Sequence, residues 1–88
     1  MMFVILSYDV SEKRVEKVGK TVRKYLWEVH KSVYNGHLTE RQFENLKIAL
    51  RKLIVPAEDS IYIYKTEHWN TLDIEQIGKI KETEYITL

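Results

Sequence analysis

The chain has 88 residues, which is enough for one domain with a modest core. It contains no cysteine, so disulfide frameworks, thiolate zinc sites and thiol catalysis are excluded. The formal net charge of +1 hides an asymmetry, because residues 11–56 carry eleven Lys or Arg against five Asp or Glu, whereas residues 57–88 carry three against seven. The basic part could bind phosphate, although charged helices are usually just solvated.

The first predicted element is a buried strand over residues 3–8, because residues 1–6 are all apolar. A helix is expected next, with Ser11 as its N-cap and a stripe of apolar residues facing the core. The outer face of this helix is basic and carries Lys13, Lys17, Lys20 and Lys24. Since the apolar start is too short for a signal peptide or a membrane span, we expect a soluble, cytoplasmic protein with no membrane partner.

Residues 27–38 alternate between apolar and polar side chains, which indicates extended chain. Asn35-Gly36 is a turn signal within this stretch. The pattern suits either one strand or two short strands with a bend near Lys31. A second helix is then predicted from Thr39 to Pro56, because Thr39 has the capping-box spacing to a glutamine three residues later and the proline ends the helix.

The last third of the chain indicates strands. Residues 60–65 alternate, with isoleucines on one side and tyrosines on the other. Further expected elements are a strand over residues 72–77, a turn at Gly78-Lys79 and a last short strand over residues 84–88. With residues 27–38 counted as two strands, the order of the elements becomes βαββαβ. We therefore predict a ferredoxin-like α+β sandwich, in which two helices lie on one face of an antiparallel sheet with extra C-terminal strands. The prediction is a single domain over residues 1–88.

Most catalytic templates are absent, including the glycine-rich phosphate loop, the GxSxG elbow and the HExxH helix. The three histidines are scattered with no helical pairing, and His30 and His37 are expected to be surface or sheet-edge residues. Tyr62 and Tyr64 share one face of their strand and could stack on bases, although packing on the sheet is the commoner reason for such a pair.

Asp9 stands out because a buried strand ends on this single carboxylate. It could favour the start of the following helix, remain a solvated loop acid, or bind a divalent cation, since Mg²⁺ and Mn²⁺ prefer carboxylate oxygens. One acid alone holds Mg²⁺ poorly, whereas two copies of Asp9 facing each other across a two-fold axis could hold it well. The chemistry of the residue leaves all three roles open.

Several motifs follow one another along the chain: Tyr8-Asp9 after an apolar strand, Ser32-Val33-Tyr34 and Gly36 after a basic helix, and Asp59-Ser60 before an alternating strand. With these motifs the chain resembles the family of CRISPR-associated protein two, the small core protein of CRISPR spacer acquisition. Their order, spacing and the total length are more specific than any one of them, and the match covers nearly the whole chain. Three positions depart from the usual pattern: His30 replaces glutamine, Tyr34 replaces phenylalanine and Leu26-Trp27 replaces a glycine.

The resemblance implies a ferredoxin-like homodimer in which the strand over residues 84–88 pairs with the sheet of the partner subunit. It implies that Asp9 is the catalytic and metal-binding residue at the dimer axis. There, Mg²⁺ or Mn²⁺ would support endonuclease hydrolysis of phosphodiester bonds in single-stranded RNA or double-stranded DNA. It also implies a complex with CRISPR-associated protein one, the integrase, in antiviral defence.

In this enzyme hypothesis, two Asp9 carboxylates share one metal ion, and turnover is expected to be slow because the site has few acids. The expected contacts to nucleic acid are Arg14, Lys17 and Lys20. The residues expected to line the cleft are Tyr8, Ser32 and Tyr34. Two alternatives remain: a non-catalytic dimer that is a DNA-binding scaffold for the integrase, and a ribonuclease toxin on the same fold.

Overall fold

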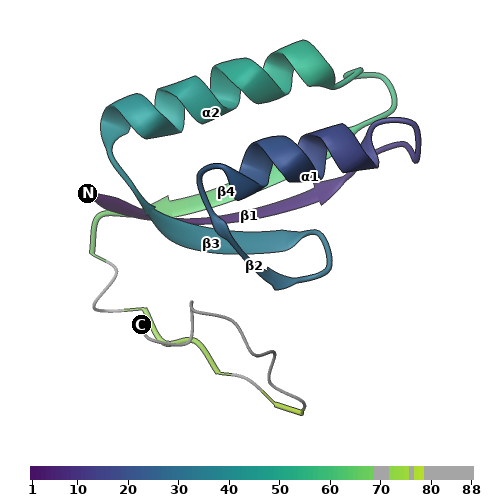
Figure 1. Cartoon of the computed structure of the whole chain (residues 1–88). Helices are drawn as coiled ribbons and strands as arrows, with labels where there is room; N and C mark the ends of the chain where they lie inside the picture. Colours follow the sequence, from purple (N-terminus) through teal and green to yellow (C-terminus); the bar gives the residue numbers. More distant parts are fainter. Residues whose placement is uncertain (69–71, 76, 79–88) are drawn as a thin grey trace.

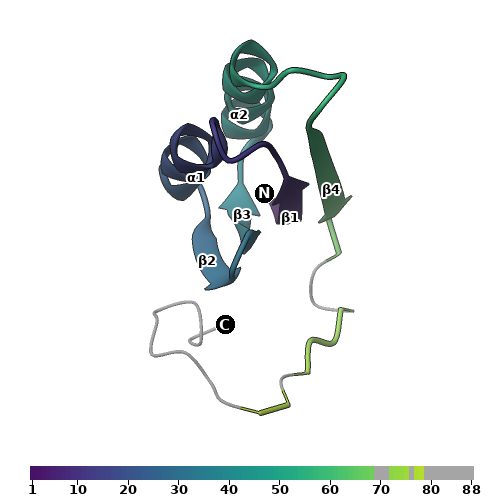
Figure 2. The same cartoon turned by 90° about the vertical axis from the view of Figure 1, so that its right-hand side faces the viewer.

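Four strands and two helices form in the residues that the computed structural model describes, which are 1–68, 72–75 and 77–78. They are β1 (Met2–Asp9), α1 (Val15–Arg23), β2 (Trp27–His30), β3 (Val33–Leu38), α2 (Glu40–Leu53) and β4 (Ser60–Thr66). The sheet has the strand order β2-β3-β1-β4, and every pairing is antiparallel. Both helices lie on one face of this sheet (Figures 1 and 2). This is the predicted ferredoxin-like arrangement.

The core lies between the helices and one face of the sheet. Along β1, the side chains of Met2, Val4, Leu6 and Tyr8 pack into this core. The helices close it with Val18 and Val22 from α1 and with Phe43, Leu46 and Leu50 from α2. The alternate residues of each strand point to the opposite face, which we call the helix-free face.

The first helix begins later than predicted. Ser11 opens a turn, in which its carbonyl oxygen accepts hydrogen bonds from the amides of Arg14 and Val15, and α1 starts only at Val15. The helix cap is Arg14, whose side chain makes no capping hydrogen bond. The prediction of Ser11 as the N-cap was therefore wrong by one turn, because the residues between it and Val15 form a tight turn that feeds the helix.

Residues 27–38 form two strands, β2 and β3, that bend at Lys31 and Ser32. The predicted turn at Asn35-Gly36 is wrong, because both residues lie inside β3. Gly36 serves close packing instead, since a Cβ atom there would lie 3.0 Å from Cδ2 of the core residue Leu26. The turn is formed by Ser32, whose φ of 63° lies in the left-handed region.

The capping box of the second helix is confirmed. The Thr39 hydroxyl accepts a hydrogen bond from the amide of Gln42, and the Gln42 side chain accepts one from the amide of Thr39, at 3.1 and 2.9 Å. After α2, residues 55–59 form a turn that returns the chain to the sheet as β4. There, Ile61 and Ile63 pack against the core, whereas Tyr62 and Tyr64 are exposed, so the predicted alternation is confirmed.

Beyond β4, the prediction of a strand over residues 72–77 is wrong for the residues that are described, since 72–75 and 77 are not in a strand. The reason is that alternation stabilises a strand only when one face is buried, and Leu72, Ile74 and Ile77 are all exposed. The strand predicted over residues 84–88 lies outside the described residues, as does Lys79 of the predicted turn.

Candidate active site

Asp9 is the last residue of β1 and lies opposite Ser60 of β4 in the sheet register. Because the preceding residue, Tyr8, points into the core, Asp9 points to the helix-free face. Its side chain is exposed, and no residue in the described part of the chain forms an ion pair or a hydrogen bond with its carboxylate.

The donor chemistry of Asp9 suits a hard cation such as Mg²⁺ or Mn²⁺, which proteins commonly hold with one or two carboxylates together with water and substrate phosphate. Among the described residues, however, no three His, Cys, Asp or Glu side chains lie close enough together to hold a metal ion. Asp9 is therefore not part of such a group of three in the described part of the chain.

Ser32 lies at the same end of the sheet as Asp9. Its carbonyl oxygen accepts a hydrogen bond of 3.1 Å from the backbone amide of Tyr8, the residue before Asp9. The left-handed backbone of Ser32 makes this possible, because it turns β2 back into β3 within two residues. The structure therefore brings the half-buried Ser32 next to the backbone of Tyr8, whereas the side chains of its predicted companions Tyr8 and Tyr34 are buried in the core.

Tyr8 and Tyr34 do not line a surface cleft of the chain, because they are only 8% and 1% exposed. Their rings stack in the core with centroids 5.8 Å apart, and their hydroxyl groups lie 3.4 Å from each other. Burial, followed by the hydrogen bond with Tyr8, raises the pKa of Tyr34 to about 12. At neutral pH the Tyr34 hydroxyl is therefore protonated.

Arg23 and Gly19 complete this tyrosine cluster, and sequence reasoning missed both. Nη1 of Arg23 donates a hydrogen bond of 3.1 Å to the Tyr34 hydroxyl. A Cβ atom at Gly19 would lie 3.1 Å from both this nitrogen and the Tyr8 hydroxyl. Gly19 therefore leaves room for Arg23 beside the two tyrosine hydroxyl groups. The one sign of this cluster in the sequence is a glycine inside a helical pattern.

The guanidinium of Arg14, a predicted contact to nucleic acid, binds two acids of the same chain. Its Nε lies 2.6 Å from Oδ2 of Asp59, and its Nη2 lies 2.7 Å from Oε1 of Glu58. This contact holds the pKa of Asp59 well below its usual range, so the carboxyl is charged at neutral pH. The side chain of Arg14 is only 18% exposed.

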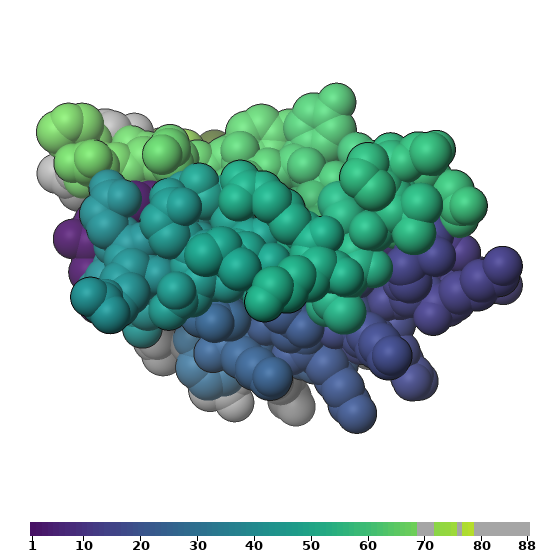
Figure 3. All heavy atoms as spheres, turned by 90° about the horizontal axis from the view of Figure 1, so that it is seen from above, coloured from purple at the N-terminus to yellow at the C-terminus, as the bar shows by residue number. Residues whose placement is uncertain are grey.

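The other two predicted contacts to nucleic acid, Lys17 and Lys20, are exposed on α1, and neither forms an ion pair with a described residue. They belong to the helix layer, which Figure 3 shows from above with α1 and α2 side by side.

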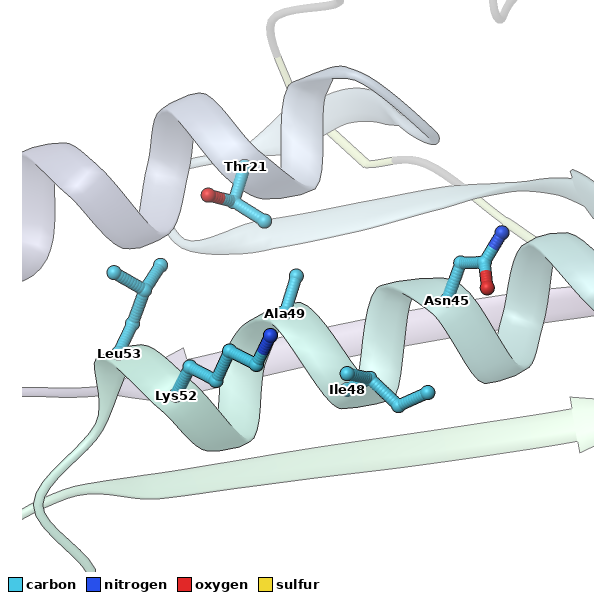
Figure 4. Close-up of a pocket in the computed structure, with 6 residues that line it drawn as sticks. All are labelled: Thr21, Asn45, Ile48, Ala49, Lys52 and Leu53. Atoms are coloured by element: carbon cyan, nitrogen blue, oxygen red, sulfur yellow. The ribbon is translucent and has the colours of Figure 1, made fainter.

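A groove of about 400 Å³ lies between the two helices (Figure 4). It is mainly apolar and is lined by Thr21, Asn45, Ile48, Ala49, Lys52 and Leu53. None of the predicted site residues lines it. We therefore place the candidate site at the end of β1 rather than in this groove.

No helix among the described residues is long and apolar enough to cross a membrane.

Two comparisons with proteins of known sequence cover most of the chain. A protein of Thermotoga maritima named CRISPR-associated endoribonuclease Cas2 is 42% identical over 77 residues, which is 88% of each chain. One of Dictyoglomus turgidum with the same name is 39% identical over 97% of this chain and 100% of its own length.

The fold leads to the same group of proteins. A solved structure described as a crystal structure of Cas2 superposes with a TM-score of 0.81 at 30% identity, and the match covers 94% of this chain and 93% of the other. Residues 2–74 match the sequence pattern of the family described as CRISPR associated protein Cas2. This chain belongs to the Cas2 family.

Proposed function

We propose that this chain is a homodimeric, metal-dependent endonuclease of CRISPR spacer acquisition that hydrolyses phosphodiester bonds in single-stranded RNA, in double-stranded DNA or in both. The observation that carries the proposal is Asp9, an exposed carboxylate without a partner among the described residues, at the end of a buried strand. The relatives named endoribonucleases support it, because they match this chain over most of their length.

The helix-free face supports the homodimer. It carries three large exposed side chains, Trp27, Tyr62 and Tyr64, which are 53%, 64% and 61% exposed. The register places Trp27 and Tyr64 on either side of the sheet centre in one row, and Tyr62 nearer to Asp9. Aromatic side chains of this kind are enriched in protein interfaces. A second copy packed on this face would bury them and bring a second Asp9 toward the first.

In the proposed dimer, the two Asp9 carboxylates would hold one divalent ion. When bound, Mg²⁺ or Mn²⁺ would stabilise negative charge on the scissile phosphate and lower the pKa of a nearby water. The water oxygen attacks phosphorus, the bond to the leaving oxygen breaks, and solvent supplies and takes up the protons. Lys17 and Lys20 neutralise flanking phosphates, and the Ser32 hydroxyl lines the approach to the scissile bond. With so few acids, slow turnover is expected.

The test is cleavage of labelled single-stranded RNA and of duplex DNA by wild type and by Asp9→Asn, each with Mg²⁺, with Mn²⁺ and with EDTA. The matched control is Glu12→Gln, which removes the same charge from an exposed residue three positions later. We expect cleavage that needs the metal, is lost in Asp9→Asn and persists in Glu12→Gln. Equal cleavage by wild type and Asp9→Asn would refute the proposal.

A second function is favoured by four exposed lysines in the first helix and in the turns on either side of it: Lys13, Lys17, Lys20 and Lys24. A dimer presents this row twice and would suit a duplex of DNA, as a non-catalytic scaffold in complex with the integrase, CRISPR-associated protein one. Such binding depends on phosphate charge and weakens steeply with salt. Replacing Lys17 and Lys20 by glutamine should then abolish duplex retention, while Asp9→Asn should leave it intact.

A further inference from the structure

Asp59 is a buried carboxylate to which the proposed chemistry assigns no role. Its side chain is fully shielded from solvent. Its Oδ1 accepts hydrogen bonds from the Ser11 amide at 2.9 Å and from Nη2 of Arg14 at 3.1 Å. Its Oδ2 accepts hydrogen bonds from Nε of Arg14 at 2.6 Å and from the Val55 amide at 2.8 Å. Four donors thus satisfy this one carboxylate.

These donors come from two loops that flank Asp9. Ser11 and Arg14 belong to the loop that follows β1, so the first contact is only two residues beyond Asp9. Asp59 itself immediately precedes Ser60, the residue opposite Asp9 in the sheet. The carboxylate therefore ties the chain leaving Asp9 to the strand that pairs with Asp9.

We propose that Arg14 and Asp59 form a clamp that positions Asp9, and that Arg14 acts through this clamp and not as a contact to phosphate; the proposal rests on the nuclease function proposed above. An arginine suits this role because its planar fork spans both oxygens of a carboxylate, which the single ammonium of lysine does not. The same Nη2 also donates a hydrogen bond of 2.7 Å to Oε1 of Glu58. Arg14 and Asp59 are positioning residues, since neither would touch the reacting atoms.

The decisive variant is Arg14→Lys, which keeps the charge but loses the two-pronged contact. A positioning role predicts that kcat for the cleaved nucleic acid falls roughly 10- to 100-fold, because small displacements of a reacting group are costly. KM of Arg14→Lys should stay within about twofold of the wild-type KM, and Asp59→Asn should show the same fall in kcat with little change in KM. Because the two residues act as a unit, the double variant should be no slower than the slower single variant. Lys17→Gln is the matched control and should raise KM instead.

Three measurements decide between positioning and binding. The folded fraction of every variant at the assay temperature is measured by thermal melting, so that a loss of folded protein is not counted as a loss of kcat. If Arg14→Lys cleaves like wild type and Arg14→Gln raises KM as Lys17→Gln does, Arg14 is a contact to phosphate and the clamp is refuted. Titration with Mn²⁺ gives a second readout, since a displaced Asp9 should bind the ion more weakly in Arg14→Lys.

Amide hydrogen exchange separates failure of the clamp from failure of the nuclease function. If wild type cleaves nothing, the nuclease proposal fails, but exchange at Asp9 and Ser11 still tests the clamp. Exchange at these amides at least tenfold faster in Arg14→Lys than in wild type, with exchange at Val4 in the middle of β1 unchanged, would support it. Unchanged exchange at Asp9 and Ser11 would refute it.

Discussion

Replacing Tyr34 by phenylalanine should destabilise this chain, although phenylalanine is the residue that the resembled family usually has at this position. Tyr34 is 1% exposed, and its hydroxyl lies 3.1 Å from Nη1 of Arg23 and 3.4 Å from the Tyr8 hydroxyl. The substitution removes a hydrogen bond from a charged donor. It also leaves the buried hydroxyl of Tyr8 without the only partner it has among the described residues.

The magnitude follows from these two losses. A hydrogen bond from a charged group contributes about 1.5–3 kcal/mol, and the lower end applies here because Arg23 is exposed and water can replace the hydroxyl. The contact between the two tyrosines is long, so its loss adds little beyond the burial of the Tyr8 hydroxyl. We expect the free energy of unfolding to fall by about 2 kcal/mol. For a domain of this size, that lowers Tm by roughly 8–16 °C.

Urea and thermal unfolding of Tyr34→Phe measure this change. Tyr25→Phe is the control, because its hydroxyl makes no hydrogen bond with a described residue, and we expect a change within about 0.5 kcal/mol. Tyr8→Phe combined with Tyr34→Phe should cost less than the sum of the single changes, because no hydroxyl is then left without a partner. A Tyr34→Phe protein as stable as wild type would refute this reasoning.

Three further predictions concern stability. Thr39→Ala should lower the free energy of unfolding by about 1 kcal/mol in urea through loss of the helix cap, whereas Thr39→Ser should keep most of it. Ser32→Gly should raise the free energy of unfolding by roughly 0.5 kcal/mol, because glycine adopts the left-handed backbone without the steric cost that serine has, and this gain exceeds the added entropy of the unfolded chain. A decrease in the free energy of unfolding would contradict the conformation of this turn. Because folding lowers the pKa of Asp59, its charged carboxylate stabilises the fold fully above the unfolded pKa of about 3.9. This stabilisation is lost as the pH falls toward the folded pKa. In acid titrations followed by circular dichroism, the folded fraction of Asp59→Asn should therefore decline less steeply below pH 4 than that of wild type.

The elements that could be predicted are those with a local cause. The apolar run at residues 3–8, the capping box at Thr39 and the alternation in residues 60–65 each depend on neighbouring residues, and each appears in the structure. The order of these elements along the chain is then sufficient to predict the ferredoxin-like topology of the sheet. The bend near Lys31, which the two-strand alternative requires, is where the structure turns, at Lys31 and Ser32. Asn35-Gly36 predicts a turn because Asn-Gly is a strong local turn signal, but the pairing of β3 with β1 keeps both residues inside the strand.

The surroundings of Asp9 could not be predicted to the same depth. The carboxylate itself was found because it ends an apolar strand. The contacts of Arg14 with Asp59 join residues 45 positions apart, and only the folded sheet brings them together. Likewise, one sequence does not show that Tyr34 points into the core and meets Arg23, because Tyr34 lies in a strand where alternate residues face opposite sides.

The measurement that tests the proposed site most directly is the stoichiometry of Mn²⁺ binding by isothermal titration calorimetry, together with the mass of the protein in solution. If two Asp9 carboxylates share one ion, wild type should be a dimer that binds one Mn²⁺ per two chains, and Asp9→Asn should be a dimer that binds none. One ion bound per chain, or unchanged binding in Asp9→Asn, would contradict the shared site.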